Sequence, residues 1–392
     1  MGNPLRIDMP EEEMAARRRL VDACHALAND RAVVHLFADS PFYCRLAGIP
    51  VGELYRSPEA MLRAQLVGWK RILEAVDCDV PGPAVKLDFG TCLAASIYGC
   101  ELVEQAGSTP GFKPWFASES DLETLDRIDP RTNGLRAQEL ATYRWYRDHA
   151  EDFPVAFAGG EPFYPAAHVR LGTACEGPLS IACMIAGADR VLLWCHDRPG
   201  LVSRMVALIT EKESQRLEHA FAVMGEPGGE ITLADDYCPY VSLPMYKELI
   251  LPHQQRLRDA FGPSIRFHSC IPDPRLLRPW RDELRISLFN GFKPQGGLAS
   301  LRRDYQPVAD VLGGRMVLES DIDGANVMVA SAARLRRAAT DWLEVLGPFS
   351  GAKLGATLSG GHRPDDLAKV GALKAAVLEA AGGASAPGAN LV

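Results

Sequence analysis

The feature that most constrains the fold of this chain is an alternation of short β-rich runs with amphipathic helices from residue 84 onward. The β-rich runs cover residues 84–89, 168–174, 230–237, 264–270, 285–292, 315–322 and 352–359. Helical patterns lie between and after them, at residues 200–224, 244–261, 331–346 and 365–381. Strand–helix alternation is typical of parallel strands, and more than six such units favour a closed (β/α)8 barrel over an open doubly wound sheet.

The first eighty residues have the pattern of helices. The stretch PEEEMAARRRLVDACHALAND opens with acidic residues and turns basic, which suits the helix dipole. A second predicted helix begins with Ser57 as its N-cap, and Pro58 and Glu59 lie in its first turn. We therefore predict an α/β protein: a helical segment over 1–80, a single (β/α)8 barrel of the TIM type over 81–381, and a flexible tail over 382–392.

Composition narrows the class of protein. A net charge of −8 and a pI near 5.7, without clusters of Lys and Arg, predict neither a nucleic-acid nor a membrane partner. No run of about 18 apolar residues and no signal-peptide pattern occur, so we expect a cytoplasmic enzyme with a small-molecule substrate. The ten cysteines are scattered without a CxxC pair, which indicates reduced thiols. No GxGxxG or GxxxxGK[ST] motif follows a predicted strand.

Chemically reactive side chains gather at the predicted carboxyl ends of the strands, where barrel enzymes carry their active sites. These residues are Asp88, Cys175, Glu176, Asp235, Asp236, His268, Cys270, Glu319, Asp321 and His362. Acids, histidines and a cysteine are thus expected to converge on one mouth.

His268 and Cys270 end the run SIRFHSC and form the pair that suggests a metal. Residues two apart on a strand face the same side, and zinc binds nitrogen and sulfur. His362, ninety-four residues on (362 − 268), follows the last predicted strand and is the candidate third ligand. The alternative is a hydrogen-bonded core histidine beside a buried free cysteine, and the spacing alone leaves both open.

The acidic residues have less specific patterns. Asp235 and Asp236 are adjacent on a strand and point opposite ways, so at most one is expected to reach the mouth directly as a catalytic group; the alternative is an acidic strand end exposed to water. Glu319 shares a strand face with Asp321 and is a candidate fourth ligand, or orients a ligand histidine from behind. Asp88 and Glu176 are candidate substrate-binding acids, with helix capping or a loop position as the alternative.

Several stretches resemble the uroporphyrinogen decarboxylase superfamily. The longest is ITLADDYCPYVSLPMYKELILPHQQRLRDAFGPSIRFHSC, which is similar to its central signature. EGPLSIACMIAG, KLDFGTCLAASIYGCEL and LSGGHRPDDLAKVGALKAAVLEA resemble further segments, so the likeness spans roughly residues 84–381. The resemblance implies a (β/α)8 barrel, in agreement with the strand pattern.

The superfamily has two branches that differ in chemistry. The decarboxylases act on acidic tetrapyrroles without a metal, using an Arg-rich N-terminal loop and an Asp at the first barrel strand. This chain has no such loop, and Gly90 falls where that Asp is expected, with Asp88 two positions off. The closer resemblance is therefore to the corrinoid:thiol methyltransferases (methylcobamide:coenzyme M methyltransferases).

That branch carries His-x-Cys and a later Cys as zinc ligands, and His268 and Cys270 match the first two. Where the later Cys is expected this chain has His362, either as a substituted ligand or as a substrate contact like the His that the decarboxylases carry there. The resemblance implies a zinc-dependent methyl (alkyl) transferase that activates a thiol, with a corrinoid or corrinoid protein as methyl donor. Asp235 or Asp236 would orient the donor or accept the thiol proton. We also consider a homodimer. The alternatives are a cofactor-free decarboxylase acting on a polycarboxylate, and a barrel that only binds its ligand.

Overall fold

The computed structural model describes residues 3–383, so the predicted flexible tail lies almost entirely outside the described residues. Its main sheet has seven strands, all parallel, in the order β2-β11-β10-β9-β8-β7-β6. They are β2 (Val33–Ala38), β6 (Ala174–Glu176), β7 (Thr232–Ala234), β8 (Ile265–His268), β9 (Ile286–Phe292), β10 (Val317–Ile322) and β11 (Ala352–Leu358). The predicted α/β class with parallel strands is confirmed.

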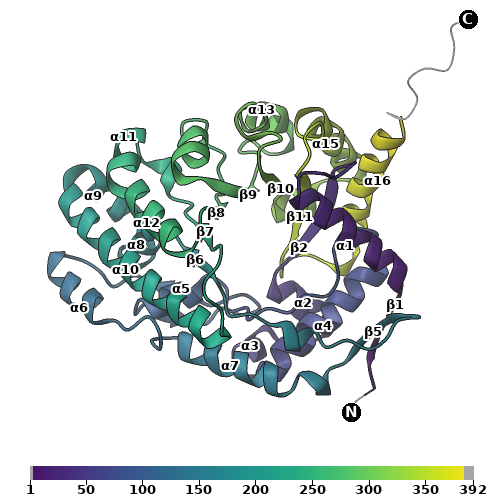
Figure 1. Ribbon diagram of the computed structural model, residues 1–392, viewed down its shortest axis with the longest axis horizontal. Helices are drawn as coiled ribbons and strands as arrows, with labels where there is room; N and C mark the ends of the chain where they lie inside the picture. Colours follow the sequence, from purple (N-terminus) through teal and green to yellow (C-terminus); the bar gives the residue numbers. More distant parts are fainter. Residues whose placement is uncertain (1–2, 384–392) are drawn as a thin grey trace, which may run out of the picture.

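α-Helices surround the strands of this curved sheet, and several of them pack on its outer side (Figure 1). They are α1 (Glu11–His25), α2 (Ser40–Ala47), α3 (Val51–Leu54), α4 (Pro58–Ala75), α5 (Cys92–Ile97), α6 (Leu122–Arg127), α7 (Arg136–Asp148), α8 (Pro178–Ala186), α9 (Ala188–Asp197), α10 (Pro199–Met224), α11 (Leu243–Met245), α12 (Leu251–Phe261), α13 (Leu301–Leu312), α14 (Gly324–Val329), α15 (Ala332–Val345) and α16 (Leu367–Gly383). Alternate strand residues such as Ile265 and Phe267 are fully buried, while Arg266 and His268 between them are only partly buried. The alternation reflects the two faces of a strand, one packed on the helices and the other facing the barrel interior.

Two small sheets complete the structure. β1 (Leu5–Pro10) pairs in parallel with β5 (Val155–Ala158), and β3 (Glu101–Val103) pairs antiparallel with β4 (Gly111–Lys113). No single helix among residues 3–383 is long and apolar enough to cross a membrane. Helices α8 and α9 are long and apolar enough only when they are taken together, and the chain bends by 113° between them.

The prediction that residues 1–80 are helical is wrong at two strands. Both β1 and β2 lie in this range, and β2 pairs with β11 over Val33–Ala38. The run VVHLFA is short and begins with two β-branched residues, which favours a strand beside an existing sheet edge. This part of the chain therefore contributes a strand to the main sheet.

The strand predicted at residues 84–89 is absent, because side chains hold its backbone. Gln65 of α4 accepts from the Lys86 N–H at 2.8 Å and donates to the Lys86 carbonyl at 2.9 Å. Trp69, one turn further along α4, donates its indole N–H to the Ala84 carbonyl at 2.8 Å. With these groups satisfied, the segment does not pair with a neighbouring strand.

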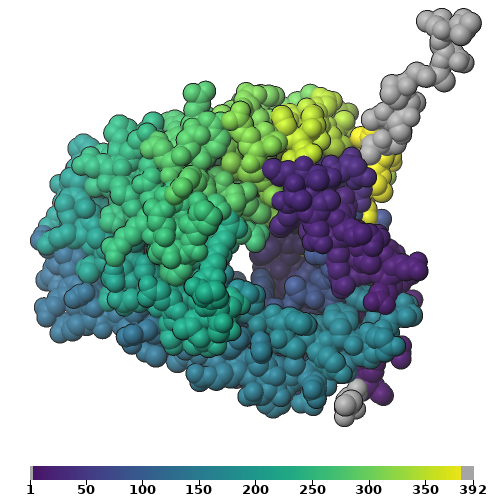
Figure 2. Space-filling view, viewed as in Figure 1, coloured from purple at the N-terminus to yellow at the C-terminus, as the bar shows by residue number. Residues whose placement is uncertain are grey.

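The predicted strand at 168–174 also begins late, at Ala174. Arg216 of α10 donates to the carbonyls of Gly172 and Ala174, and Glu139 of α7 accepts from the Gly172 N–H. In the described part of the chain the sheet is therefore open between β2 and β6, and hydrogen bonds do not close the barrel. Figure 2 shows an opening near the middle of the molecule, between teal and purple parts of the chain.

Candidate metal centre and its cavity

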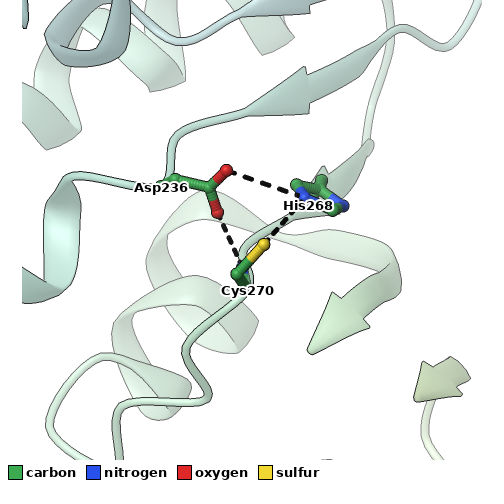
Figure 3. Close-up of side chains that lie close together, drawn as sticks. All are labelled: Asp236, His268 and Cys270. Atoms are coloured by element: carbon green, nitrogen blue, oxygen red, sulfur yellow. Dashed lines mark hydrogen bonds and ion pairs between the residues drawn. The ribbon is translucent and has the colours of Figure 1, made fainter. Parts of the chain in front are cut away.

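Three side chains with different donor atoms meet at the carboxyl ends of β7 and β8 (Figure 3). Asp236 follows β7, His268 ends β8, and Cys270 lies two residues further on. One donor atom from each lies within 4.8 Å of the others. The His268 Nε2 atom is 3.6 Å from the Cys270 Sγ atom and 3.7 Å from an oxygen of Asp236. The other Asp236 oxygen accepts the Cys270 N–H at 2.7 Å, which fixes the carboxylate against this turn.

The orientation of His268 depends on the end of β9. Its Nδ1 atom lies 3.1 Å from the Asn290 side-chain oxygen, an acceptor, so Nδ1 carries the proton and the Nε2 lone pair faces Cys270 and Asp236. Gly291 follows in a left-handed conformation (φ 77°), and a Cβ there would lie 2.0 Å from the imidazole. Asn290 and Gly291 thus provide the hydrogen bond and the space that the ring needs.

Burial sets the protonation of this group. Desolvation lowers the pKa of His268, so its imidazole is neutral near pH 7, as a metal ligand must be. Burial, and then the Asp236 charge, raise the pKa of Cys270 to about 11. Without a cation the thiol therefore keeps its proton. The nitrogen, sulfur and oxygen donors are a set that zinc accepts, and three protein ligands leave a coordination position open.

The group opens into a cavity of about 980 Å³ at the mouth of the sheet. Tyr237 and Tyr240 lie on its wall, and Lys293 is its one Lys or Arg among the described residues. Glu176, at the end of β6, also lines it. Burial, followed by the charge of Asp236, raises the pKa of Glu176 to about 8, so this acid holds a proton at pH 7. Glu176 thus lies at the mouth, as the strand pattern predicts, and its role as a substrate-binding acid stays a prediction.

Asp235 points away from the cavity and is fully buried. It accepts hydrogen bonds from the Ser180 N–H (3.0 Å) and hydroxyl (2.8 Å) and from the Gln254 amide (2.8 Å). Burial raises its pKa to about 6. The two aspartates do point opposite ways, so Asp235 anchors the first turn of α8 while Asp236 faces the mouth.

His362 and Glu319 are not brought into the group of three. The His362 ring accepts the Ser359 N–H at Nδ1 (2.9 Å) and contacts the Gly324 carbonyl through Nε2 (2.8 Å). Glu319 forms an ion pair with Lys353 inside the barrel. A role for either as a ligand remains a prediction, which requires these bonds to be given up.

Asp88 lies outside the lining of the mouth cavity. Its carboxylate accepts the Ser40 hydroxyl at 2.5 Å and is 3.1 Å from the Lys86 ammonium. Sequence reasoning missed Asn290 and Lys293, although a signal was present. An Asn-Gly pair inside a β-rich run indicates a distorted strand end, which is where mouth residues are placed.

Comparison with known proteins reveals the fold and no close relative. No protein-family model matches the chain, and no curated protein matches it. Among solved structures, a methyltransferase from Methanosarcina mazei has a TM-score of 0.63 and 19% identity, covering 92% of this chain and 97% of that one. The chain therefore has the fold of that protein, as the resemblance in sequence implied. A B12-independent methionine synthase from Shewanella sp. W3-18-1, in complex with selenomethionine, has a TM-score of 0.41 and 10% identity over 85% and 89% of the two chains, too low to carry an argument.

Proposed function

We propose that the protein is a metal-dependent methyltransferase that delivers a methyl group to a small thiol at the mouth of the sheet. The observation that carries the proposal is the meeting of Asp236, His268 and Cys270, whose donor atoms lie within 4.8 Å of one another. The shared fold with a protein described as a methyltransferase supports it. Zinc is the metal that this donor set favours, and a bound zinc would lower the pKa of a substrate thiol in its open position.

The residues of the chain would divide the remaining work. Asn290 holds His268 in the tautomer that presents Nε2, and the Cys270 N–H holds Asp236. Glu176 carries its proton at neutral pH and can donate a hydrogen bond to a ligand in the cavity. The cavity of about 980 Å³ admits a small organic substrate beside the group, and we include a corrinoid, free or protein-bound, as the methyl donor.

The decarboxylase alternative needs several cations to hold a polycarboxylate. Among the described residues, the mouth cavity offers Lys293 and no arginine. Carboxylates are bound most specifically by bidentate arginine, so the lining favours a substrate with fewer anionic groups. This contrast makes methyl transfer the better supported function.

Metal analysis of the purified protein tests the proposal. We expect about one zinc per chain, lost in Cys270→Ala and His268→Ala and retained in His196→Ala, whose side chain is 80% exposed. Zinc-loaded protein should demethylate methylcobalamin in the presence of a thiol. The change in corrinoid absorbance measures this reaction. Full activity in protein stripped of metal would refute the proposal. If a folded His362→Asn variant lost its zinc, the third metal ligand would be His362 and not Asp236.

A further inference from the structure

A second, smaller cavity of about 200 Å³ lies inside the barrel next to the candidate metal centre. His268 and Lys293 line both this inner cavity and the mouth cavity. The rest of the inner lining comes from β2, β9, β10 and β11, including His35, Glu319 and Asp321. A ligand in the inner cavity would therefore lie beside the imidazole of His268.

Two polar atoms in this lining have no hydrogen-bond partner among the described residues. One is an oxygen of Asp321, a side chain that is 7% exposed, and the other is Nδ1 of His35. The second oxygen of Asp321 accepts the Thr357 hydroxyl, so the carboxylate is held in place with one oxygen free. A buried polar group without a partner costs about 1–3 kcal/mol, so a ligand donor that reached this oxygen would recover part of that cost.

Lys293 supplies the opposite charge. In the described part of the chain no carboxylate lies within 4.0 Å of its ammonium, whereas Lys353, the other lysine beside this lining, is paired with Glu319. Glu319, the other acid of the lining, is already paired with Lys353. The cavity thus offers one cation and one anion, Lys293 and Asp321, that are not paired with each other.

We propose that the inner cavity is a subsite for a small zwitterionic head group of the amino-acid type. The ligand ammonium binds the free oxygen of Asp321, and its anionic group binds Lys293. A singly charged ligand would leave one of these two groups without a counter-charge, whereas a zwitterion matches both. A quaternary ammonium would leave this oxygen of Asp321 without a hydrogen-bond donor, so the subsite favours an ammonium that carries N–H groups.

The cost of ionising Asp321 agrees with such a ligand. Burial raises the pKa of Asp321 to about 6, and the charge of Lys293 only partly opposes this rise. A bound ammonium would provide the cation that the carboxylate lacks. The inference rests on the proposed function in one respect, since it makes the methyl acceptor a thiol that carries an amino-acid head group.

Calorimetry with three matched probes tests the subsite apart from the metal. L-Alanine, propionate and ethylamine share a short carbon skeleton and differ in which charges they carry. We expect alanine to bind at least ten-fold more tightly than either partial analogue, in zinc-loaded and metal-free protein alike. Asp321→Asn should abolish the preference over propionate, and Lys293→Met the preference over ethylamine, while the exposed controls Asp148→Asn and Lys247→Met change neither.

The sulfur-containing counterparts connect the subsite to catalysis. As a methyl acceptor, cysteine should have a kcat/KM at least ten-fold higher than 3-mercaptopropionate and cysteamine. The same order should hold for the three counterparts whose carbon chains are one methylene longer. Equal binding of alanine and its analogues, or an unchanged preference in both variants, would overturn the subsite. A protein that binds no zinc even when zinc is supplied, but still prefers alanine, would refute the proposed function and keep the subsite.

Discussion

The ion pair between Glu319 and Lys353 allows a quantitative test of what these residues do. The Lys353 ammonium also contacts Nε2 of His25 at 2.6 Å, and the side chains of Glu319 and Lys353 are 15% and 7% exposed. Burial alone would raise the pKa of Glu319, yet the charge of Lys353, followed by that of His35 and by the hydrogen bond from Lys353, lowers it from 4.5 to about 2. The difference corresponds to about 3 kcal/mol of folding free energy at pH 7.

Glu319→Gln should therefore destabilise the protein by about 3 kcal/mol at pH 7, because it leaves a buried ammonium without its anion. The sign follows from a folded pKa below the unfolded one: the contribution is complete above pH 4.5 and is lost as the pH falls towards 2. The gap between wild type and variant should shrink to about 1 kcal/mol at pH 3. Urea unfolding of both proteins from pH 7 to pH 3 measures it.

A second Lys–Glu pair provides the control. Lys247 and Glu283 are 44% and 39% exposed, so Glu283→Gln should change stability by less than about 1 kcal/mol. A gap below about 1 kcal/mol for Glu319→Gln, or one that does not vary with pH, would refute the reasoning. If Glu319→Gln lost its zinc while keeping its stability, Glu319 would be a metal ligand as the sequence predicts.

Three further substitutions test the residues that position His268 and the arginine that binds the segment before β6, beside the opening between β2 and β6. Gly291→Ala should weaken zinc binding at least ten-fold in a chelator competition, because its Cβ would strike His268, while Gly225→Ala (φ 73°, nothing within 4 Å) should leave zinc affinity unchanged. Asn290→Ala should lower zinc affinity by about 10- to 100-fold with little change in melting temperature; an unchanged affinity would contradict its role. Arg216→Met should cost about 3–5 kcal/mol in urea unfolding, since it leaves a buried carboxylate unpaired; a cost below about 1 kcal/mol would show that the pair is dispensable.

Local patterns were enough to predict the parallel strands and the pairing of His268 with Cys270. Each depends on residues close in sequence: helix and strand periods, and the two-residue repeat of a strand. The opposite directions of Asp235 and Asp236 follow from the same repeat. At the carboxyl end of β8, the side chains of His268 and Cys270 lie next to each other, as the two-residue spacing predicts.

Interactions between distant residues account for what could not be predicted. A β-rich run such as 84–89 has the pattern of a strand whether or not Gln65 and Trp69 hold its backbone. The pairing of Glu319 with Lys353 likewise joins neighbouring strands, and no sequence spacing reveals it. For His362, the tight turn from Ser359 supplies a local partner for the ring, which competes with any metal.

All three donors of the candidate centre lie within residues 236–270, on one strand–helix–strand unit. Bonds inside this unit, and to the adjacent strand β9, set their geometry. Motion of the two sides of the gap between β2 and β6 would change the width of the barrel while the donor triangle kept its dimensions. If the protein is the methyltransferase proposed above, a bulky methyl donor would be admitted on the side of β2 and β6, while the spacing of the three donor side chains stays fixed.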